Sequence, residues 1–108
     1  METRIATDQP LVTLINVFTV DPADQHKLVE ALIEATQQVM SKLPGFVSAN
    51  IHRSLDGTRV TNYAQWRTQA DVEALFRNPD AAPHMKKCQE LATNEGRLYE
   101  VAYVDNVA

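Results

Sequence analysis

An α+β fold, with one antiparallel four-stranded sheet and helices on one of its faces, is predicted by the order of structural signals along the chain. Segments with strand periodicity and segments with helix periodicity alternate as β-α-β-β-α-β, with the second helical region broken in two. An Asp-Gly pair at residues 56–57 separates two alternating segments and predicts a hairpin between them. This order is that of a ferredoxin-like sandwich.

The composition is typical of a single globular domain, with 108 residues, 44% hydrophobic and 22% charged. A net charge of −4 argues against a surface for nucleic acid, which requires a basic patch. No apolar run is long enough to span a bilayer, so we expect no membrane partner. The single cysteine, Cys88, allows no internal disulfide, which favours a cytoplasmic protein.

The chain opens with a polar segment, residues 1–10, that ends at a proline and is expected to be a flexible N-terminal arm. Residues 11–108 then form the domain. Its first segment, Leu11–Val20, is rich in β-branched residues and apolar on both sides, which predicts a well-covered strand. Asn16 is the only amide of this strand, and the sequence leaves open which face it occupies.

The first helix is expected to begin at Asp21-Pro22, because aspartate is a preferred N-cap and proline a preferred first helical residue. Its buried stripe recurs at helical spacing over about five turns. The stripe consists of Leu28, Leu32, Ala35, Thr36, Val39 and Leu43. The helix should end at Leu43-Pro44-Gly45, since proline cannot continue it and glycine permits the exit turn.

A two-residue loop at 56–57 would set the register of the hairpin between residues 46–53 and 58–67. The expected cross-strand partners are Ile51 with Asn62, Ala49 with Ala64, and Val47 with Trp66. The two facing alanines leave a hollow bounded by Ile51, Asn62 and Trp66. An amide, an alanine and an indole on one face are unusual for a core, so we interpret this face as a pocket wall.

The other face of the hairpin is polar throughout. It carries Ser48, Asn50, His52, Thr61, Tyr63 and Gln65. These polar groups do not suit a dry core, so the face must meet water or a wet subunit interface. Because helices cover only one side of this fold, we expect the polar face to pack against a second copy in a homodimer, with His52 at the interface.

The C-terminal half is expected to contain two short helices and a strand. Residues 71–77 predict a helix that stops before Asn78-Pro79. Residues 82–93 predict another that ends at 94–96, and 97–104 predict the last strand. The buried face of the second of these helices should carry Met85, Cys88, Leu91 and Ala92.

Asn62 and Trp66 suggest chemistry because both can donate hydrogen bonds to a substrate oxygen that gains negative charge. The indole also offers a stacking surface. The alternative is a buried amide bonded to the backbone beside a tryptophan that only fills the core. The spacing of the two residues alone does not decide between these interpretations.

His84 lies in the apolar stripe of its helix, four residues before Cys88. It is either a packed rim residue or a proton acceptor, since imidazoles titrate near neutral pH. His26 lies off the stripe of the first helix and is expected to be solvated, and Cys88 suits packing better than nucleophilic attack. The histidines and the cysteine are not at ligand spacing and the three glycines all fall in predicted turns, so neither a metal site nor a phosphate loop is predicted.

Four segments together resemble the antibiotic biosynthesis monooxygenases. They are Gln25–Glu30 (QHKLVE), Pro44–Phe46 (PGF), Asp56–Thr58 (DGT) and Asn62–Trp66 (NYAQW), of which the last is the most specific. The resemblance runs from about Val12 to Val104 and is greatest to members that oxidise anthrones in polyketide pathways. It implies a dimeric α+β barrel with a pocket in each subunit, between sheet and helices.

The resemblance also implies that O₂ oxidises a polycyclic phenol or anthrone to a quinone with no flavin, haem or metal. It assigns the chemistry to Asn62 and Trp66, and it adds pocket positions on the following helices. There this chain departs from the anthrone oxygenases, with Val72 in place of a tyrosine and Lys86 in place of an arginine. The first change removes a phenol that could orient substrate or move protons, so we expect the same chemistry on a different substrate.

Substrate contacts are therefore expected from Ile51, Val72, His84 and Lys86. A regular helix would direct Lys86 away from the apolar stripe, which is in tension with its role by resemblance.

Two other functions suit the same fold. A non-catalytic protein could use the hollow to sequester a small aromatic metabolite. A haem-degrading relative is suggested by Asn16 and His84, but such relatives use a helix tryptophan where this chain has Leu75 or Phe76.

Overall fold

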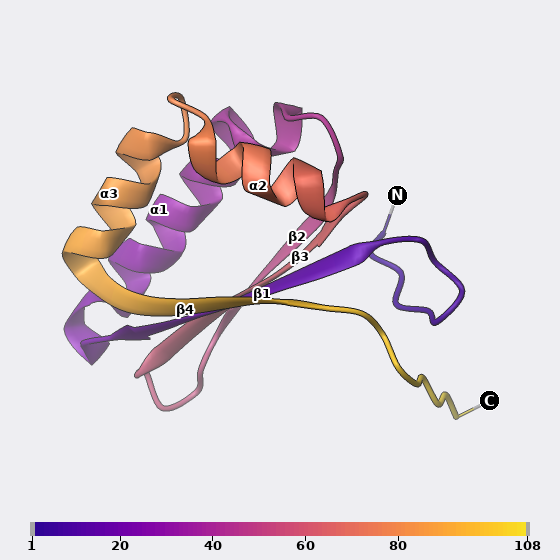
Figure 1. Cartoon of the computed structure of the whole chain (residues 1–108). Helices are drawn as coiled ribbons and strands as arrows, with labels where there is room; N and C mark the ends of the chain where they lie inside the picture. The colour runs from indigo at the N-terminus through magenta and orange to yellow at the C-terminus, as the bar shows by residue number, and fades with distance from the viewer. Residues whose placement is uncertain (1, 108) are drawn as a thin grey trace.

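The computed structural model describes residues 2–107, so that Met1 of the predicted arm and Ala108 of the predicted domain lie outside the described residues. The elements are β1 (Val12–Val20), η1 (Pro22–Asp24), α1 (Gln25–Gln38), η2 (Met40–Lys42), β2 (Phe46–Arg53), β3 (Arg59–Trp66), α2 (Gln69–Arg77), α3 (Ala82–Leu91) and β4 (Ala92–Tyr99). The strands form one antiparallel sheet in the order β2-β3-β1-β4. The helices all lie on one face of it (Figure 1). The predicted ferredoxin-like α+β architecture is confirmed.

The hairpin register is confirmed for two of the three predicted pairs, Ile51–Asn62 and Ala49–Ala64. The third pair is wrong, because a β-bulge follows Phe46 and places this residue, rather than Val47, opposite Trp66. The bulge turns a large aromatic ring toward the indole. It therefore supports Trp66 from the side at the end of the strand.

The loop of the hairpin is longer than predicted, since the Ser54 N–H donates to the Arg59 carbonyl at 3.0 Å and residues 55–58 form the turn. One residue is added on each side, so the register is unchanged. Asp56 holds the turn together by accepting from the Thr58 N–H at 3.0 Å and from the Thr58 and Ser54 hydroxyls at 2.7 and 2.8 Å. These bonds, led by that of the Thr58 N–H, lower the pKa of Asp56 to about 2.

The first helical segment begins as predicted, because the Asp21 carboxylate accepts from the Ala23 N–H at 2.9 Å. Its end is earlier than predicted. α1 stops at Gln38, and η2 carries the chain on to Leu43. The exit at Gly45 has φ +85°, as the predicted turn requires.

The C-terminal strand is the largest correction, since β4 covers Ala92–Tyr99 and not 97–104. β4 pairs with β1 from Ala92 opposite Val20 to Tyr99 opposite Thr13. A strand at 97–104 would leave the backbone N–H and C=O groups in the second half of β1 without partners on that side. Tertiary pairing therefore overrides the local turn signal of residues 94–96.

The apolar core between sheet and helices consists of two clusters. The first consists of Phe18, Val20, Leu28, Val29, Ala31, Leu32, Val60 and Cys88. The second consists of Leu14, Ala64, Trp66, Val72, Leu75 and Ala81. The even-numbered residues of β3 face this core, as predicted, and they contribute to both clusters. Among residues 2–107, no helix combines the length and the apolar character needed to cross a membrane.

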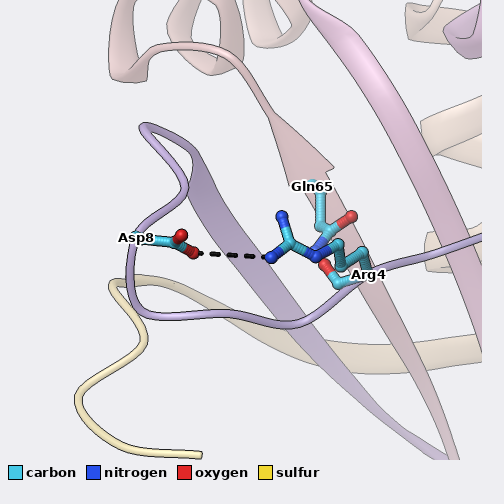
Figure 2. A network of polar contacts seen from close by, with 3 residues as sticks. All are labelled: Arg4, Asp8 and Gln65. Carbon is cyan, nitrogen blue, oxygen red and sulfur yellow. Dashed lines mark hydrogen bonds and ion pairs between the residues drawn. The ribbon is translucent and has the colours of Figure 1, made fainter.

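In the described part of the chain, the opposite, outer face of the sheet carries no helix, but the N-terminal segment contacts it. Gln65 is only 2% exposed, and its Nε2 donates to the Arg4 carbonyl oxygen at 2.6 Å while its Oε1 accepts from the Ser48 hydroxyl at 2.8 Å. Figure 2 shows Arg4 over Gln65, with the Arg4 guanidinium 3.7 Å from the Asp8 carboxylate. Gln65 therefore fastens the N-terminal segment to the outer face.

Candidate active site

A pocket of about 160 Å³ lies between the sheet and the helices, at the boundary between the two core clusters. Leu14 and Leu75 of the second cluster line it together with Phe18, Leu32 and Cys88 of the first. Its polar lining comes from Asn16, Asn62, His84, Gln89 and Asn94. The remaining walls are apolar. The pocket thus combines an apolar enclosure with a few convergent polar groups, as ligand sites commonly do.

Two amides lie side by side on the floor of this pocket. Asn62 of β3 is the direct cross-strand partner of Asn16 of β1, and Asn16 in turn lies opposite Gly96 of β4. Direct partners in an antiparallel pair have Cβ atoms roughly 5 Å apart, so the two amides can act on one substrate group. The structure thereby places Asn16, whose face the sequence left open, toward the helices.

The side chain of Asn62 is not satisfied by the protein. Its Oδ1 is buried and has no hydrogen-bond partner among residues 2–107. A buried unpaired amide oxygen costs about 1–3 kcal/mol, so native structures retain few of them without a reason. The alternative in which the backbone satisfies this oxygen does not hold. An unpaired acceptor in a pocket wall is typical of a group that binds a ligand.

Trp66 lies deeper than the pocket. It is four residues beyond Asn62 on the same face, roughly 13 Å along the strand, and it does not line the cavity. Its ring is 1% exposed and packs edge-to-face on Phe46, with ring centroids 5.5 Å apart. Its Nε1 is nevertheless buried without a hydrogen-bond partner. Both residues predicted for the chemistry therefore carry an unpaired buried polar atom.

The hollow expected above Ala49 and Ala64 is filled by helix side chains. Val72, only 2% exposed, packs in the second cluster together with Ala64, and Ile51 packs against the first. Neither Val72 nor Ile51 lines the pocket. The cavity is therefore displaced toward β1 and β4 from its expected place, because α2 and its neighbours occupy the space above the alanines.

α3 brings His84 and Cys88, one turn apart, into the pocket wall. Cys88 is 4% exposed, and burial raises the pKa of its thiol, so the thiol stays protonated at neutral pH. This agrees with a packing role. Lys86 is exposed and does not line the pocket, as the helical geometry predicted against its role by resemblance.

The pocket residues that were not predicted include Phe76, Gln89 and Asn94. Asn94 was assigned to a turn, whereas in β4 it lies opposite Phe18 and points to the helix side. Its Nδ2 donates to Asn16 Oδ1 at 3.0 Å. Strand periodicity would have found Asn94 if the start of β4 had been known. Within residues 2–107, no three His, Cys, Asp or Glu side chains gather closely enough to hold a metal ion.

Residues 11–91 match the family model described as antibiotic biosynthesis monooxygenase. The chain belongs to this family. The resemblance that its sequence segments suggested is thereby confirmed. Asn16, Asn62 and Trp66, whose indole N–H has no partner, all lie within the matched residues of this antibiotic biosynthesis monooxygenase.

Relatives of this antibiotic biosynthesis monooxygenase include the tetracenomycin-F1 monooxygenase of Streptomyces glaucescens, which is 39% identical over 99 residues, or 92% of this chain and 88% of that protein. A monooxygenase from the ActVA-Orf6 gene of Streptomyces coelicolor, solved in complex with nanaomycin D, superposes with a TM-score of 0.80 at 31% identity, over 90% of this chain and 92% of that one. SnoaB, a cofactor-independent oxygenase from Streptomyces nogalater, has a TM-score of 0.75 at 23% identity, over 88% and 96% of the two chains, and shows the shared fold. The enzyme class is accordingly that of a monooxygenase.

Proposed function

We propose that this monooxygenase oxidises a polycyclic phenol or anthrone to a quinone with O₂, and that it does so without a flavin, haem or metal cofactor. The observation that carries the proposal is the pair of neighbouring amides on the floor of an apolar pocket, one of them with an unpaired buried oxygen. Aromatic rings suit the walls, and a phenolic or enolate oxygen suits the amides.

The chemistry needs little from the protein. An anthrone that loses a proton from its methylene carbon becomes an electron-rich enolate, which passes one electron to O₂. The carbon radical and superoxide then combine, with a proton, to form the C–O bond of a hydroperoxide. Loss of water breaks the O–O bond and leaves a second carbonyl. One oxygen atom enters the quinone and the other leaves as water, so no external reductant is consumed.

The pocket residues favour the first of these steps. Asn62 offers an N–H to the developing enolate oxygen and an unpaired Oδ1 to a neighbouring phenolic hydroxyl. Asn16, beside it, offers a second amide. His84, from the helix side, is the proton acceptor. Trp66 lies outside the cavity, so its unpaired N–H would reach a substrate oxygen only if side chains of the second cluster moved aside.

The size of the pocket limits how the substrate lies. A cavity of roughly 150 Å³ holds a molecule such as benzene, so the 160 Å³ found here accommodates about one ring. The other rings of a polycyclic substrate must therefore extend to the mouth, where Phe76 is 53% exposed. In this pose the reacting ring is held at the amides, and Ile51, Val72 and Lys86 make no direct contact with it.

An oxygen electrode tests the proposal directly. The purified protein should consume O₂ with dithranol, a simple anthrone, faster than a protein-free control, and a metal chelator should not slow it. The control is essential because anthrones also oxidise unaided. A rate equal to the control, together with tight binding of the aromatic, would support the non-catalytic binding protein instead. A flavin or haem absorption spectrum in the pure protein would contradict the cofactor-free reaction.

The outer face of the sheet leads us to propose a homodimer. No helix of the described residues 2–107 covers this face (Figure 1), and it carries the half-buried Ile15, Val17 and Tyr63 beside the exposed Tyr99. Sedimentation at micromolar concentration should give a dimer. Tyr63→Glu should give a folded monomer, because a charge cannot be buried unpaired in the interface. Leu55→Glu, at a fully exposed position of the hairpin loop, should stay dimeric. A stable monomeric wild type would contradict this proposal.

A further inference from the structure

The two amides on the pocket floor differ in how they are held. Asn62 Oδ1 has no partner, whereas Asn16 Oδ1 accepts a hydrogen bond of 3.0 Å from Asn94 Nδ2. The terminal torsion of an asparagine is broad and roughly two-fold, so a free Asn16 could present either its oxygen or its NH₂ to the pocket. Only the NH₂ group stabilises an oxyanion, and the oxygen repels it.

The sheet register explains why Asn94 can reach Asn16. Gly96 is the direct partner of Asn16, and Asn94 lies two residues earlier on the same face of β4. A Cβ on Gly96 would lie 3.4 Å from Asn16 Oδ1 and 3.5 Å from its Cγ, which is van der Waals contact, so the Asn16 side chain lies directly beside this glycine. The Asn16 side chain therefore leans over the bare glycine toward β4, with its oxygen on that side and its NH₂ group on the other.

A free Asn16 amide would also have a competing partner inside the pocket. Asn62, its cross-strand neighbour, presents a buried oxygen that nothing satisfies. An Asn16 released from β4 could lean toward β3 and bring its NH₂ group within reach of that oxygen, and the two amides would then satisfy each other instead of a substrate. The bond from Asn94 opposes this collapse.

We propose that Asn94 is a positioning residue, which holds Asn16 by its oxygen so that the Asn16 NH₂ group stays available to the substrate oxyanion. This inference rests on the proposed oxidation of a phenol or anthrone. Asn94 itself lies at the exposed mouth of the pocket, so substitutions there should leave the core intact.

The test replaces the donor at residue 94, which bonds Asn16 Oδ1, with a group that can only accept. In Asn94→Asp the new carboxylate can only accept, so it should draw the Asn16 NH₂ group toward β4 and turn the Asn16 oxygen into the pocket. At pH 7.5 we expect kcat with dithranol to fall by about 100-fold, the effect of losing one oxyanion donor. Asn94→Ala merely frees the amide and should cost about 3–10-fold. Asn94→Gln, which keeps a donor, should recover most of the activity.

The order of activities separates positioning from a structural role. Loss of packing alone would make the alanine variant the poorest, and the nearly isosteric aspartate variant would then be close to wild type. The ratio of kcat for Asn94→Asp to that of wild type should rise toward one as the pH falls to about 4 and the new carboxyl regains a proton. Taking this ratio removes any effect of pH on the groups that both proteins share, including His84 and Cys88 in the pocket wall. Gln37→Glu, an added charge on the exposed side of α1, should leave kcat unchanged.

A spectrum of the side-chain amides keeps the inference separate from the proposed oxidation. In a ¹⁵N–¹H spectrum, the Asn16 NH₂ signals, assigned by their loss in Asn16→Asp, should move in Asn94→Asp at pH 7.5 and return at low pH. If they move while wild type never exceeds the protein-free control, the oxidation is wrong and the positioning of Asn16 stands. Unmoved signals, or an aspartate variant as active as the alanine variant, would overturn the inference.

Discussion

Asn62→Ala should lower kcat for the oxidation of dithranol by about 10²–10³-fold, because it removes a donor that acts on the enolate oxygen in the transition state. kcat and kcat/KM should fall together, as they do when an interaction made only in the transition state is lost. Stability should not fall with them, since the substitution also removes a buried oxygen that has no partner in the folded protein. The initial rate of O₂ uptake, corrected for the protein-free reaction, measures the first effect, and urea unfolding measures the second.

Gln37→Ala is the matched control for Asn62→Ala, because it removes an exposed amide from α1. It should leave kcat, kcat/KM and the free energy of unfolding unchanged. If Asn62→Ala raised KM alone, the amide would serve binding only. If it unfolded the protein without affecting the rate per folded molecule, Asn62 would be a structural residue of the sheet.

Trp66→Phe should lower kcat by about 10–100-fold while the protein stays folded. Phenylalanine retains most of the apolar contact with Phe46 but lacks the Nε1–H, which is buried and unpaired. Removing an unsatisfied donor relieves about 1–3 kcal/mol and offsets part of the packing lost with the smaller ring. A variant that is as active as wild type would show that the indole only fills the second core cluster.

Phe46→Leu separates the contribution of packing around the indole from that of the indole N–H. It disturbs the packing around the indole and keeps its N–H, so it should lower the midpoint of thermal unfolding and leave kcat unchanged. Equal losses of kcat in Phe46→Leu and Trp66→Phe would assign the effect to packing rather than to the hydrogen bond.

Local patterns predicted the centre of the sheet well. The alternation around Asn62, together with the Asp-Gly turn, correctly placed Asn62 opposite Ile51 and on the helix-covered face. A shift of one residue would have moved every side chain of the strand to the other face, so the burial pattern strongly restricts the register. The longer turn left the predicted register unchanged because it added one residue on each side. The bulge after Phe46 has no equally clear signal in the sequence.

The pocket itself could not be predicted from single segments. Its walls converge from β1, β3, β4, α1, η2, α2 and α3, and the place where they leave space depends on how those elements pack. The alanine pair suggested a hollow directly above it, but Val72 and Leu75 fill that space. The position of Asn94 in the pocket was missed for a different reason, since residues 94–96 resemble a turn until β1 provides the partner strand.

The pocket wall contains the only thiol of the protein, so a thiol-specific reagent can modify the protein only at this site. Cys88 is almost fully buried and its thiol is held in the protonated form, so reagents that need a thiolate attack it slowly. A reagent that alkylates Cys88 must first enter the pocket, in the space where we propose that the aromatic substrate binds. The rate of alkylation at this one sulfur is therefore a measure of how often the pocket stands open and empty.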